Sequence, residues 1–411
     1  MRSEMRPLGD FITLVSGNTP STANAAYWGG TTPWISAKDM GDFWIDDAKD
    51  HLTPLGVEAA SRLVPTGTVL LLTRGMTLHK RVPICRISRP STFNQDVKAV
   101  LPRNGLCARF LPYLLVGNHN RLHQQVDSAG HGTGRLNTGA LLSFPVHVPS
   151  ATEQESIADW GEAIDERLRL LRQTNTTLES IAQALFKSWF IDFDPVLAKA
   201  DGREPEGMDA ATAALFPAEF EESALGLIPK GWWVERLGDV LELVYGKALK
   251  ATDRRDGPIP VYGSGGIAGY HDTPLVEEGS VIVGRKGTVG SLHWEDGPFY
   301  PIDTTFYVRV KATPLTFCYY AMQRLGLETM NTDAAVPGLN RDNAYRCEVV
   351  RPASSTTMAF DDIVRSLRAS MKSGTKKMQL LTQLRDALLP RLISGKLRLP
   401  EAQRQLEDAL A

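Results

Sequence analysis

Apolar residues recur at every seventh position in two segments of this 411-residue chain, 203 residues apart. The first series starts at Ile157 and the second at Phe360. Sustained seven-residue spacing of apolar residues is typical of helices that pair as a coiled coil. We therefore predict two long helices that pair through Ile157, Ile164, Leu171, Leu178 and Leu185 in the first and Leu367, Leu381 and Leu388 in the second. Beside these positions we expect Trp160, Leu168, Ile181 and Trp189 in the first helix and Ile363, Val364, Met371, Met378 and Leu384 in the second. The alternative is that each stripe is buried within its own half of the chain.

Two residues interrupt the apolar pattern. Asn175 places an amide beside the first series, and Gly374 occupies a seam position of the second. Glycine costs about 1 kcal/mol in a helix interior relative to alanine, so we expect the second helix to be weaker there. The net charge is −4 over residues 153–200 and +6 over residues 354–400. Opposite charges favour pairing of the two helices over separate burial.

The sequence in front of each helix is also repeated. Arg6–Gly17 matches Glu235–Gly246, and each half later reaches a Gly/Leu/Asn turn. From the leucine of that turn to the leucine of a later Ala-Leu pair there are 49 residues in both halves. A register kept over this distance indicates a duplicated domain that ends in a rigid helix. Alternating apolar segments in these domains predict strands: Thr68–Leu72, Gly279–Val283 and Tyr300–Val310.

These patterns predict an α+β fold of two related domains, each followed by a long helix. The helices would pack as an antiparallel coiled coil with pseudo-two-fold symmetry. A segment rich in Pro, Gly, Ala and Glu separates the two halves. The predicted parts are a first domain at 1–152, a first helix at 153–200, a linker at 201–230, a second domain at 231–353, and a second helix with a C-terminal tail at 354–411.

Charge is distributed unevenly although the whole chain carries only −2. Residues 59–152 contain eleven bases and two acids, whereas residues 153–222 contain sixteen acids and six bases. Such a split is typical of a chain with a basic surface for an anionic partner and an acidic segment with a different role. The alternative is that both are solvated faces.

Known catalytic motifs are missing from the sequence. There is no GxxxxGK[ST], HExxH or GxSxG, and Asp194-Pro-Val lacks the Asn/Asp-Pro-Pro-aromatic loop of an amino-methyltransferase. Asp192, Asp194 and Lys199 resemble a nuclease cluster but fit better as charged residues at a helix end. The four cysteines form no CxxC pair and are expected to be reduced thiols, not metal ligands. With no apolar leader or membrane span, we predict a non-catalytic cytoplasmic protein that holds no metal or cofactor.

What remains is a set of polar, mostly basic side chains in glycine-flanked loops. Such groups neutralise phosphates and read the edges of bases. The candidate DNA-binding residues are Ser36, Lys38, Arg74, Thr77, His79, Lys80, Arg81, Asn94 and Gln95 in the first half, and Ser264, Arg285, Lys286, Thr288, His293, Thr304 and Thr305 in the second.

Four segments resemble the specificity subunits of type I restriction–modification systems. They are Ala184–Pro195, Leu388–Leu397, Trp34-Ile-Ser36 and Val261–Tyr270. The resemblance implies two target-recognition domains, each reading half of a split site in double-stranded DNA, with the helices as a ruler. It also implies two adenine-N6 methyltransferase partners that use S-adenosylmethionine, and in the full complex two restriction subunits, motor-nucleases that use ATP and Mg. The nearly neutral second domain, with eight bases and seven acids over residues 279–352, suggests that its hold on DNA relies more on the methyltransferase.

Helix length sets a rough scale for the split site. Residues 153–190 as one helix would span roughly 57 Å, or about 16 base pairs at about 3.4 Å per step. Three alternatives stay open: an enzyme fused to recognition domains, a scaffold that binds only proteins, and the recognition subunit of a related two-component system that cuts on both sides of its site.

Overall fold

The computed structural model describes residues 5–60, 62–128, 132–330 and 338–410. The chain divides into two compact units. The first unit consists of Met1–Leu171 together with Lys376–Ala411, and the second unit is Arg172–Thr375. Both boundaries fall inside the long helices, so each unit contains about half of each helix. No helix in the described ranges is long and apolar enough to cross a membrane.

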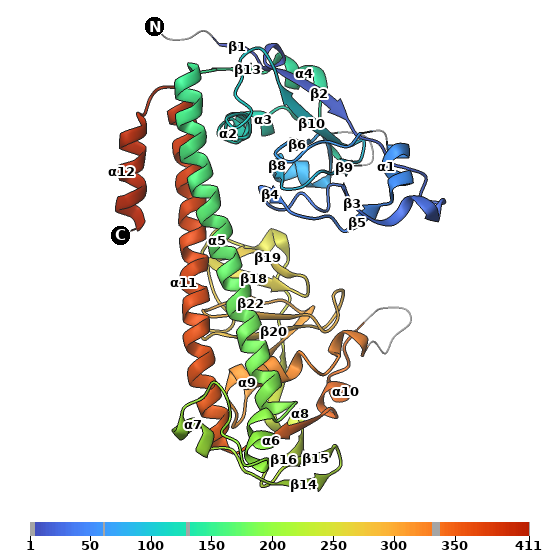
Figure 1. Ribbon diagram of the computed structural model, residues 1–411, viewed down its shortest axis with the longest axis vertical. Coiled ribbons are helices and arrows are strands. Elements are labelled where there is room, and N and C mark those ends of the chain that lie inside the picture. Colours follow the sequence, from blue (N-terminus) through green and yellow to red (C-terminus); the bar gives the residue numbers. More distant parts are fainter. Residues whose placement is uncertain (1–4, 61, 129–131, 331–337, 411) are drawn as a thin grey trace. The chain divides into compact units, whose positions relative to one another are not determined.

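The two long helices are α5 (Ala151–Phe190) and α11 (Ser354–Ile393), each of 40 residues (Figure 1). In the first unit, Ile164 at the start of α5 shares a hydrophobic core with Leu381 and Leu388 near the end of α11. In the second unit, Phe186 near the end of α5 packs on Phe360 at the start of α11. The helices therefore run antiparallel, which confirms the predicted coiled-coil pairing.

The predicted seam is buried unevenly. Ile157, Ile164, Leu381 and Leu388 are fully buried, whereas Leu171, Leu178, Leu185 and Leu367 are half-buried. Ile181 and Ile363, predicted beside the seam, are 47% and 39% exposed, so that expectation is wrong. Trp160, Leu168, Trp189 and Val364, also predicted beside the seam, are buried, and Ala182 is buried in place of Ile181. A helix repeats every 3.6 residues and not every 3.5, so the buried stripe drifts from a strict heptad.

Asn175 and Gly374 lie against each other where the helices pass in the second unit. The Asn175 amide donates to the Met371 carbonyl (3.2 Å) and to Thr375 Oγ1 (3.1 Å). A Cβ at position 374 would stand 2.7 Å from Asn175 Oδ1. The glycine that weakens α11 in isolation therefore makes room for an amide that holds the pair together.

The first unit contains a five-stranded sheet and smaller sheets beside it (Figure 1). The five strands, in spatial order, are β2 (Ile12–Ser16), β10 (Val97–Pro102), β6 (Val69–Leu72), β8 (Ile84–Ile87) and β4 (Trp44–Ile45). The smaller sheets are β5 (Asp50–Leu52) with β3 (Trp28–Ile35) and β9 (Thr92–Phe93), β11 (Val126–Ser128) with β12 (Gly134–Leu136) and β7 (Arg74–Gly75), and β1 (Arg6–Pro7) with β13 (Pro145–Val146). Its helices are α1 (Pro54–Ala60), α2 (Leu111–Gly117), α3 (His119–His123), α4 (Thr138–Ser143) and the C-terminal α12 (Leu399–Leu410).

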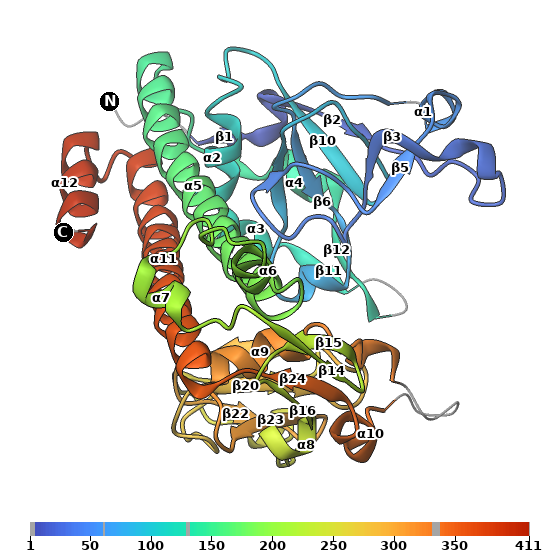
Figure 2. The ribbon, with the colours of Figure 1, turned by 60° about the horizontal axis from the view of Figure 1, so that its bottom comes forward.

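The second unit repeats this plan. Its main sheet is β17 (Leu241–Tyr245), β23 (Thr305–Val310), β20 (Ser280–Gly284) and β21 (Leu292–Glu295). Beside it lie β19 (Gly266–His271), β18 (Ile259–Gly263) and β22 (Tyr300–Pro301), and β16 (Trp233–Arg236) pairs with β24 (Glu348–Arg351). Helix α9 (Leu315–Met322) packs on β20 (Figure 2), and α8 (Leu237–Val240) and α10 (Arg341–Tyr345) complete the domain. The predicted strand Tyr300–Val310 is two strands, because the chain turns between β22 and β23.

The segment predicted as a linker has elements of its own. It follows α6 (Asp194–Ala200) and contains α7 (Ala210–Ala214), β14 (Phe220–Ser223) and β15 (Gly226–Pro229). Phe216 and Ile228 are buried in one core with Trp189, Phe190 and Trp232. A few large apolar side chains thus anchor a stretch whose overall composition is typical of a loop.

Candidate nucleic-acid interface

Most candidate residues of each unit lie in loops beside paired strands, a region called the loop edge below, and the pairing of two of these strands is the same in both units. The parallel strands β3 and β9 align Trp34 with Thr92, and β18 and β22 align Val261 with Tyr300. The Asn94 amide donates to the Ile35 carbonyl at 3.0 Å, and the Ile302 amide donates to the Tyr262 carbonyl at 2.9 Å. The duplication predicted from the sequence therefore extends to individual hydrogen bonds.

Glycine is required at one equivalent position of each unit. A Cβ on Gly17 would stand 2.0 Å from the Phe93 carbonyl oxygen, and a Cβ on Gly246 would stand 2.2 Å from that of Ile302. No side chain fits at such distances, so the chain passes directly against the neighbouring strand in both domains. These two glycines keep the loops of each edge close together.

In the first unit, exposed cations gather around β7. Arg74 on β7 lies opposite Arg135 on β12, and Lys80 follows the short 3₁₀ turn Met76–His79 after β7. All three side chains are exposed, and none of the ion pairs among the described residues involves them. Like charges on directly opposed residues repel each other, so this arrangement favours an anion between them. Arg135 was missed among the candidates; its signal was the repeated turn in which it stands.

Other candidates in the first unit hold the loops in shape. Ser36 donates through its hydroxyl and its amide to Asp39, and Asn94 Oδ1 accepts from the amides of Asp96 and Val97. The Arg81 guanidinium donates to the carbonyls of Met40 and Gly41 at 2.9 and 2.7 Å. Four other candidates remain at or near the surface beside them: Lys38, Thr77, His79 and Gln95. His79 Nε2 donates to the Gly132 carbonyl, and Gln95 Oε1 accepts from the Thr19 hydroxyl.

In the second unit the structure brings three loops together around Ser264. The Thr288 amide donates to Ser264 Oγ at 3.3 Å, and His293 Nε2 donates to the Ser264 carbonyl at 3.2 Å. The amides of Arg285 and Lys286 both donate to the Thr304 carbonyl, at 2.9 and 3.1 Å. These candidates, far apart in the sequence, therefore form one cluster.

One candidate of the second unit has a different environment from the one predicted. Thr305 is 0% exposed, and its hydroxyl donates to the Ile302 carbonyl, so it shapes the turn and has no surface to offer. The hydrogen bonds also show which residues of the two units occupy equivalent positions. Arg285 corresponds to Thr73, since their amides bond Thr304 and Asp96 alike, and Lys286 is therefore the counterpart of Arg74.

Part of the basic segment is neutralised within the first unit. Arg86 pairs with Glu162 at 2.9 Å, and Arg109 pairs with both Glu162 and Asp159 on α5. Burial alone would raise the pKa of Glu162, but hydrogen bonds from Arg109 and Arg86 hold it below its ordinary value. These acids of α5 therefore attach the helix to its own domain. None of the carboxylates in the described part of the chain forms an ion pair with the cations around β7.

The described residues show no cluster of three His, Cys, Asp or Glu side chains that could hold a metal ion. Cys85, Cys107, Cys318 and Cys347 are free thiols. Burial raises the pKa of both Cys85 and Cys318 to about 12, so these two thiols stay protonated near neutral pH.

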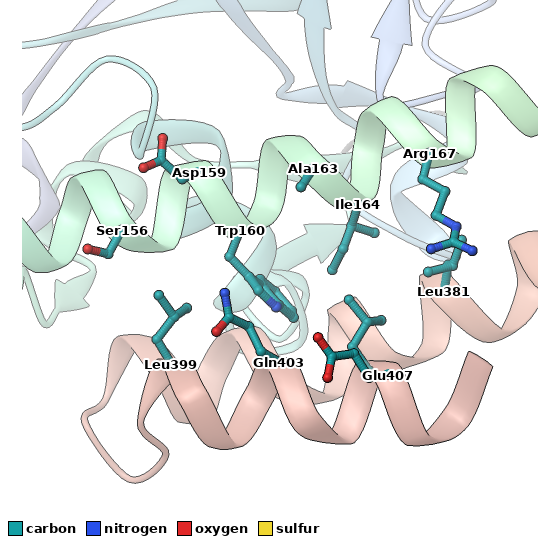
Figure 3. Close-up of a pocket in the computed structure, with 11 residues that line it drawn as sticks. Ser156, Asp159, Trp160, Ala163, Ile164, Arg167, Leu381, Leu399, Gln403 and Glu407 are labelled. Atoms are coloured by element: carbon teal, nitrogen blue, oxygen red, sulfur yellow. The ribbon is translucent and has the colours of Figure 1, made fainter. Parts of the chain in front are cut away.

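A second feature of the first unit is a cavity of ≈ 670 Å³ between α5, α11 and α12 (Figure 3). Trp160 and Ile164 of α5 face Leu399 and Gln403 of α12 across it. Trp160 is only 5% exposed, yet its indole N–H has no hydrogen-bond partner among the described residues. Leaving a buried donor unpaired is costly.

Comparison with known proteins places both units in one family pattern. The type I restriction modification DNA specificity domain matches residues 2–180 and 229–335. The specificity subunit of type I restriction enzyme MjaIX from Methanocaldococcus jannaschii is 26% identical over 427 residues, covering 97% of this chain and 94% of that protein. That of HindI from Haemophilus influenzae is 25% identical over 366 residues, covering 72% and 78%. The crystal structure of a type I restriction–modification S subunit from M. genitalium has the same fold, with a TM-score of 0.52, 17% identity, and 94% and 95% of the two chains covered.

Proposed function

This chain belongs to the type I restriction modification DNA specificity family, and we propose that it reads a bipartite, asymmetric DNA site with one half-site for each unit. The two units share their strand pairing but differ in the side chains at the common edge, such as Arg74 in one and Lys286 in the other. Related domains with different contact residues read different half-sites, so the whole site is asymmetric.

The observation that carries this proposal is the set of unpaired cations at that edge. Arg74, Lys80 and Arg135 are exposed without carboxylate partners among the described residues, whereas Arg86 and Arg109 are neutralised by α5. Phosphate contacts supply most sequence-independent affinity, and donors beside them read base edges. An edge with free cations next to amide and hydroxyl groups has the groups that both tasks need.

Salt-dependent DNA binding tests the proposal. Replacing Arg74 and Lys80 with Gln should weaken binding and reduce the slope of log K against log salt by about one unit for each phosphate that is no longer neutralised. The control is Arg81→Gln, because the Arg81 guanidinium already donates to two carbonyls within the protein. This substitution should lower the stability of the loop and leave the salt slope nearly unchanged. An unchanged slope in the Arg74/Lys80 variant would remove this edge from the DNA interface.

Recruitment of partners is the second part of the proposed function. We propose that two adenine-N6 methyltransferase subunits, which supply S-adenosylmethionine chemistry, and two ATP- and Mg-dependent restriction subunits assemble on this chain in the cytoplasm. The cavity beside Trp160 is our candidate contact for a methyltransferase, because it combines apolar lining with an unpaired donor. Ala163→Glu at its rim should weaken methyltransferase binding, whereas Thr174→Glu, also exposed on α5, should not. Equal binding by both variants would exclude this cavity.

We further propose that the chain itself transfers no methyl group. The purified chain should leave DNA unmethylated, and addition of the methyltransferase subunits should produce methylation at two adenines, one on each strand. Methylation by the isolated chain would favour the fused-enzyme alternative. Methylome sequencing of the host with and without the gene would identify the site.

A further inference from the structure

In the second unit, two arginines contact one aromatic ring at the end of a strand of the main sheet. Tyr245, the last residue of β17, is 47% exposed. The guanidinium carbons of Arg285 and Arg341 lie 5.0 and 5.1 Å from the centre of its ring. The buried Phe306 supports that ring from the neighbouring strand, with the ring centres 4.9 Å apart. Cations at this distance from an aromatic face are attracted by its π-electrons. We refer to Tyr245, Arg285 and Arg341 as the Tyr245 stack.

Neither arginine of the stack is neutralised within the described part of the chain. No carboxylate there forms an ion pair with Arg285 or Arg341. One terminal nitrogen of Arg285 donates to the Asp303 carbonyl at 2.8 Å. Arg341 also lies 5.7 Å from the ring of Tyr345, and its Nε is buried without a partner among the described residues. Aromatic rings therefore position both guanidiniums, which leaves N–H donors available to an anion.

Two cations held on one exposed ring make the local potential positive, which attracts an anion. A phosphate is the anion that a planar guanidinium binds best, through paired charge-assisted hydrogen bonds. The stack also adjoins the Ser264 cluster, because Arg285 donates its amide to the Thr304 carbonyl within that cluster. A phosphate bound here would therefore lie next to the donors proposed to read bases.

The equivalent positions of the first unit carry different side chains. By strand register, Ser16 stands where the second unit has Tyr245, opposite Lys98 instead of Phe306. The hydroxyl of Ser16 accepts a hydrogen bond from Lys98 at 2.8 Å. Thr73 takes the place of Arg285, and Thr138, directly after the capping Asn137, takes that of Arg341. The stack is thus particular to the second half-site.

We propose that the Tyr245 stack binds a backbone phosphate of the half-site read by the second unit, an inference that rests on the proposed DNA-reading function. With such a phosphate contact, the second domain can hold DNA through its own residues and does not depend on the methyltransferase for it. Residues 279–352 carry eight bases and seven acids, but two of the bases are ordered around one exposed ring. Position, and not net charge, supplies the affinity here.

The test is a salt titration of the full chain on a duplex that contains the site found by methylome sequencing. Arg341→Gln should lower the slope of log K against log salt by about one unit. Arg346→Gln removes the same charge just after α10 and should leave the slope unchanged. Tyr245→Leu keeps both charges but loses their support, so affinity should fall several-fold at every salt concentration with little change of slope. Tyr245→Phe keeps the ring and should bind like the wild type.

The outcomes separate this inference from the proposed function. If the wild type binds the duplex with a steep salt dependence that Arg74 and Lys80 variants reduce, but Arg341→Gln matches Arg346→Gln, the stack is overturned alone. If the wild type shows no salt-dependent binding, both are overturned. Each variant is first compared with the wild type by circular dichroism and thermal unfolding, and Tyr245→Phe provides a conservative replacement at the same position.

Discussion

Replacing Gly374 with alanine should destabilise the helix pair, although alanine is the better helix former. In an isolated helix this change would gain about 1 kcal/mol. In the second unit, however, the added Cβ would stand 2.7 Å from Asn175 Oδ1, closer than unbonded atoms approach. The Asn175 amide would have to rotate away, because its oxygen and the added Cβ cannot both keep these positions.

Rotation of Asn175 has a definite cost. Its amide would lose the hydrogen bonds to the Met371 carbonyl and to Thr375 Oγ1. At about 1 kcal/mol for each bond, the loss is about 2 kcal/mol against a gain of about 1 kcal/mol. Gly374→Ala should therefore lower the local free energy of unfolding by about 1 kcal/mol. In an Asn175→Ala background the obstruction is gone, and the same change should raise that free energy by about 1 kcal/mol.

Amide hydrogen exchange across residues 371–378 measures the local opening of α11 directly. Exchange should be faster in Gly374→Ala than in the wild type, and slower in the Asn175→Ala/Gly374→Ala double variant than in Asn175→Ala. Ser373→Ala, an exposed position one residue earlier, controls for helix propensity and should slow exchange slightly. Slower exchange in Gly374→Ala with Asn175 intact would refute the explanation of this glycine.

Three further predictions concern other parts of the structure. Arg385 forms an ion pair with Asp165, which is only 3% exposed, so Arg385→Ala should lower the free energy of unfolding in urea by about 3–5 kcal/mol. A decrease below about 1 kcal/mol would contradict the burial of this ion pair. Four residues inserted after Thr176, with four after Ser373 to keep the helices paired, add about 6 Å and about 400° of helix, so the unread spacer should lengthen by one or two base pairs; methylation at the original spacing would exclude the ruler. Because burial raises the pKa of Cys85 and Cys318 to about 12, a thiol reagent at pH 8 should label these two far more slowly than the other cysteines, with the difference lost on unfolding; equal rates in the native chain, measured by mass spectrometry, would show that they are accessible.

The long helices, the main strands and the duplication of the domain were predictable from the sequence. Heptad spacing over Ile157–Leu185 and alternation around Val69–Leu72 are local periodicities, and an amphipathic segment can bury its apolar face in few ways. The repeat with its constant 49-residue spacing predicted that the two domains would share one register. Local pattern was misleading where a few residues override composition, as with Phe216 and Ile228 in the segment predicted as a linker.

The tertiary structure alone decided which cations are free to meet an anion. Arg86 and Arg74 are equivalent in the sequence as members of one basic segment, but Glu162 of α5 neutralises the first and no described carboxylate reaches the second. The Tyr245 stack joins residues 245, 285 and 341, and Asn175 meets Gly374 from the other helix. Hydrogen bonds, close ion pairs and steric contacts act over a few ångströms, so they depend on which distant segments the strand register and the helix pairing bring together.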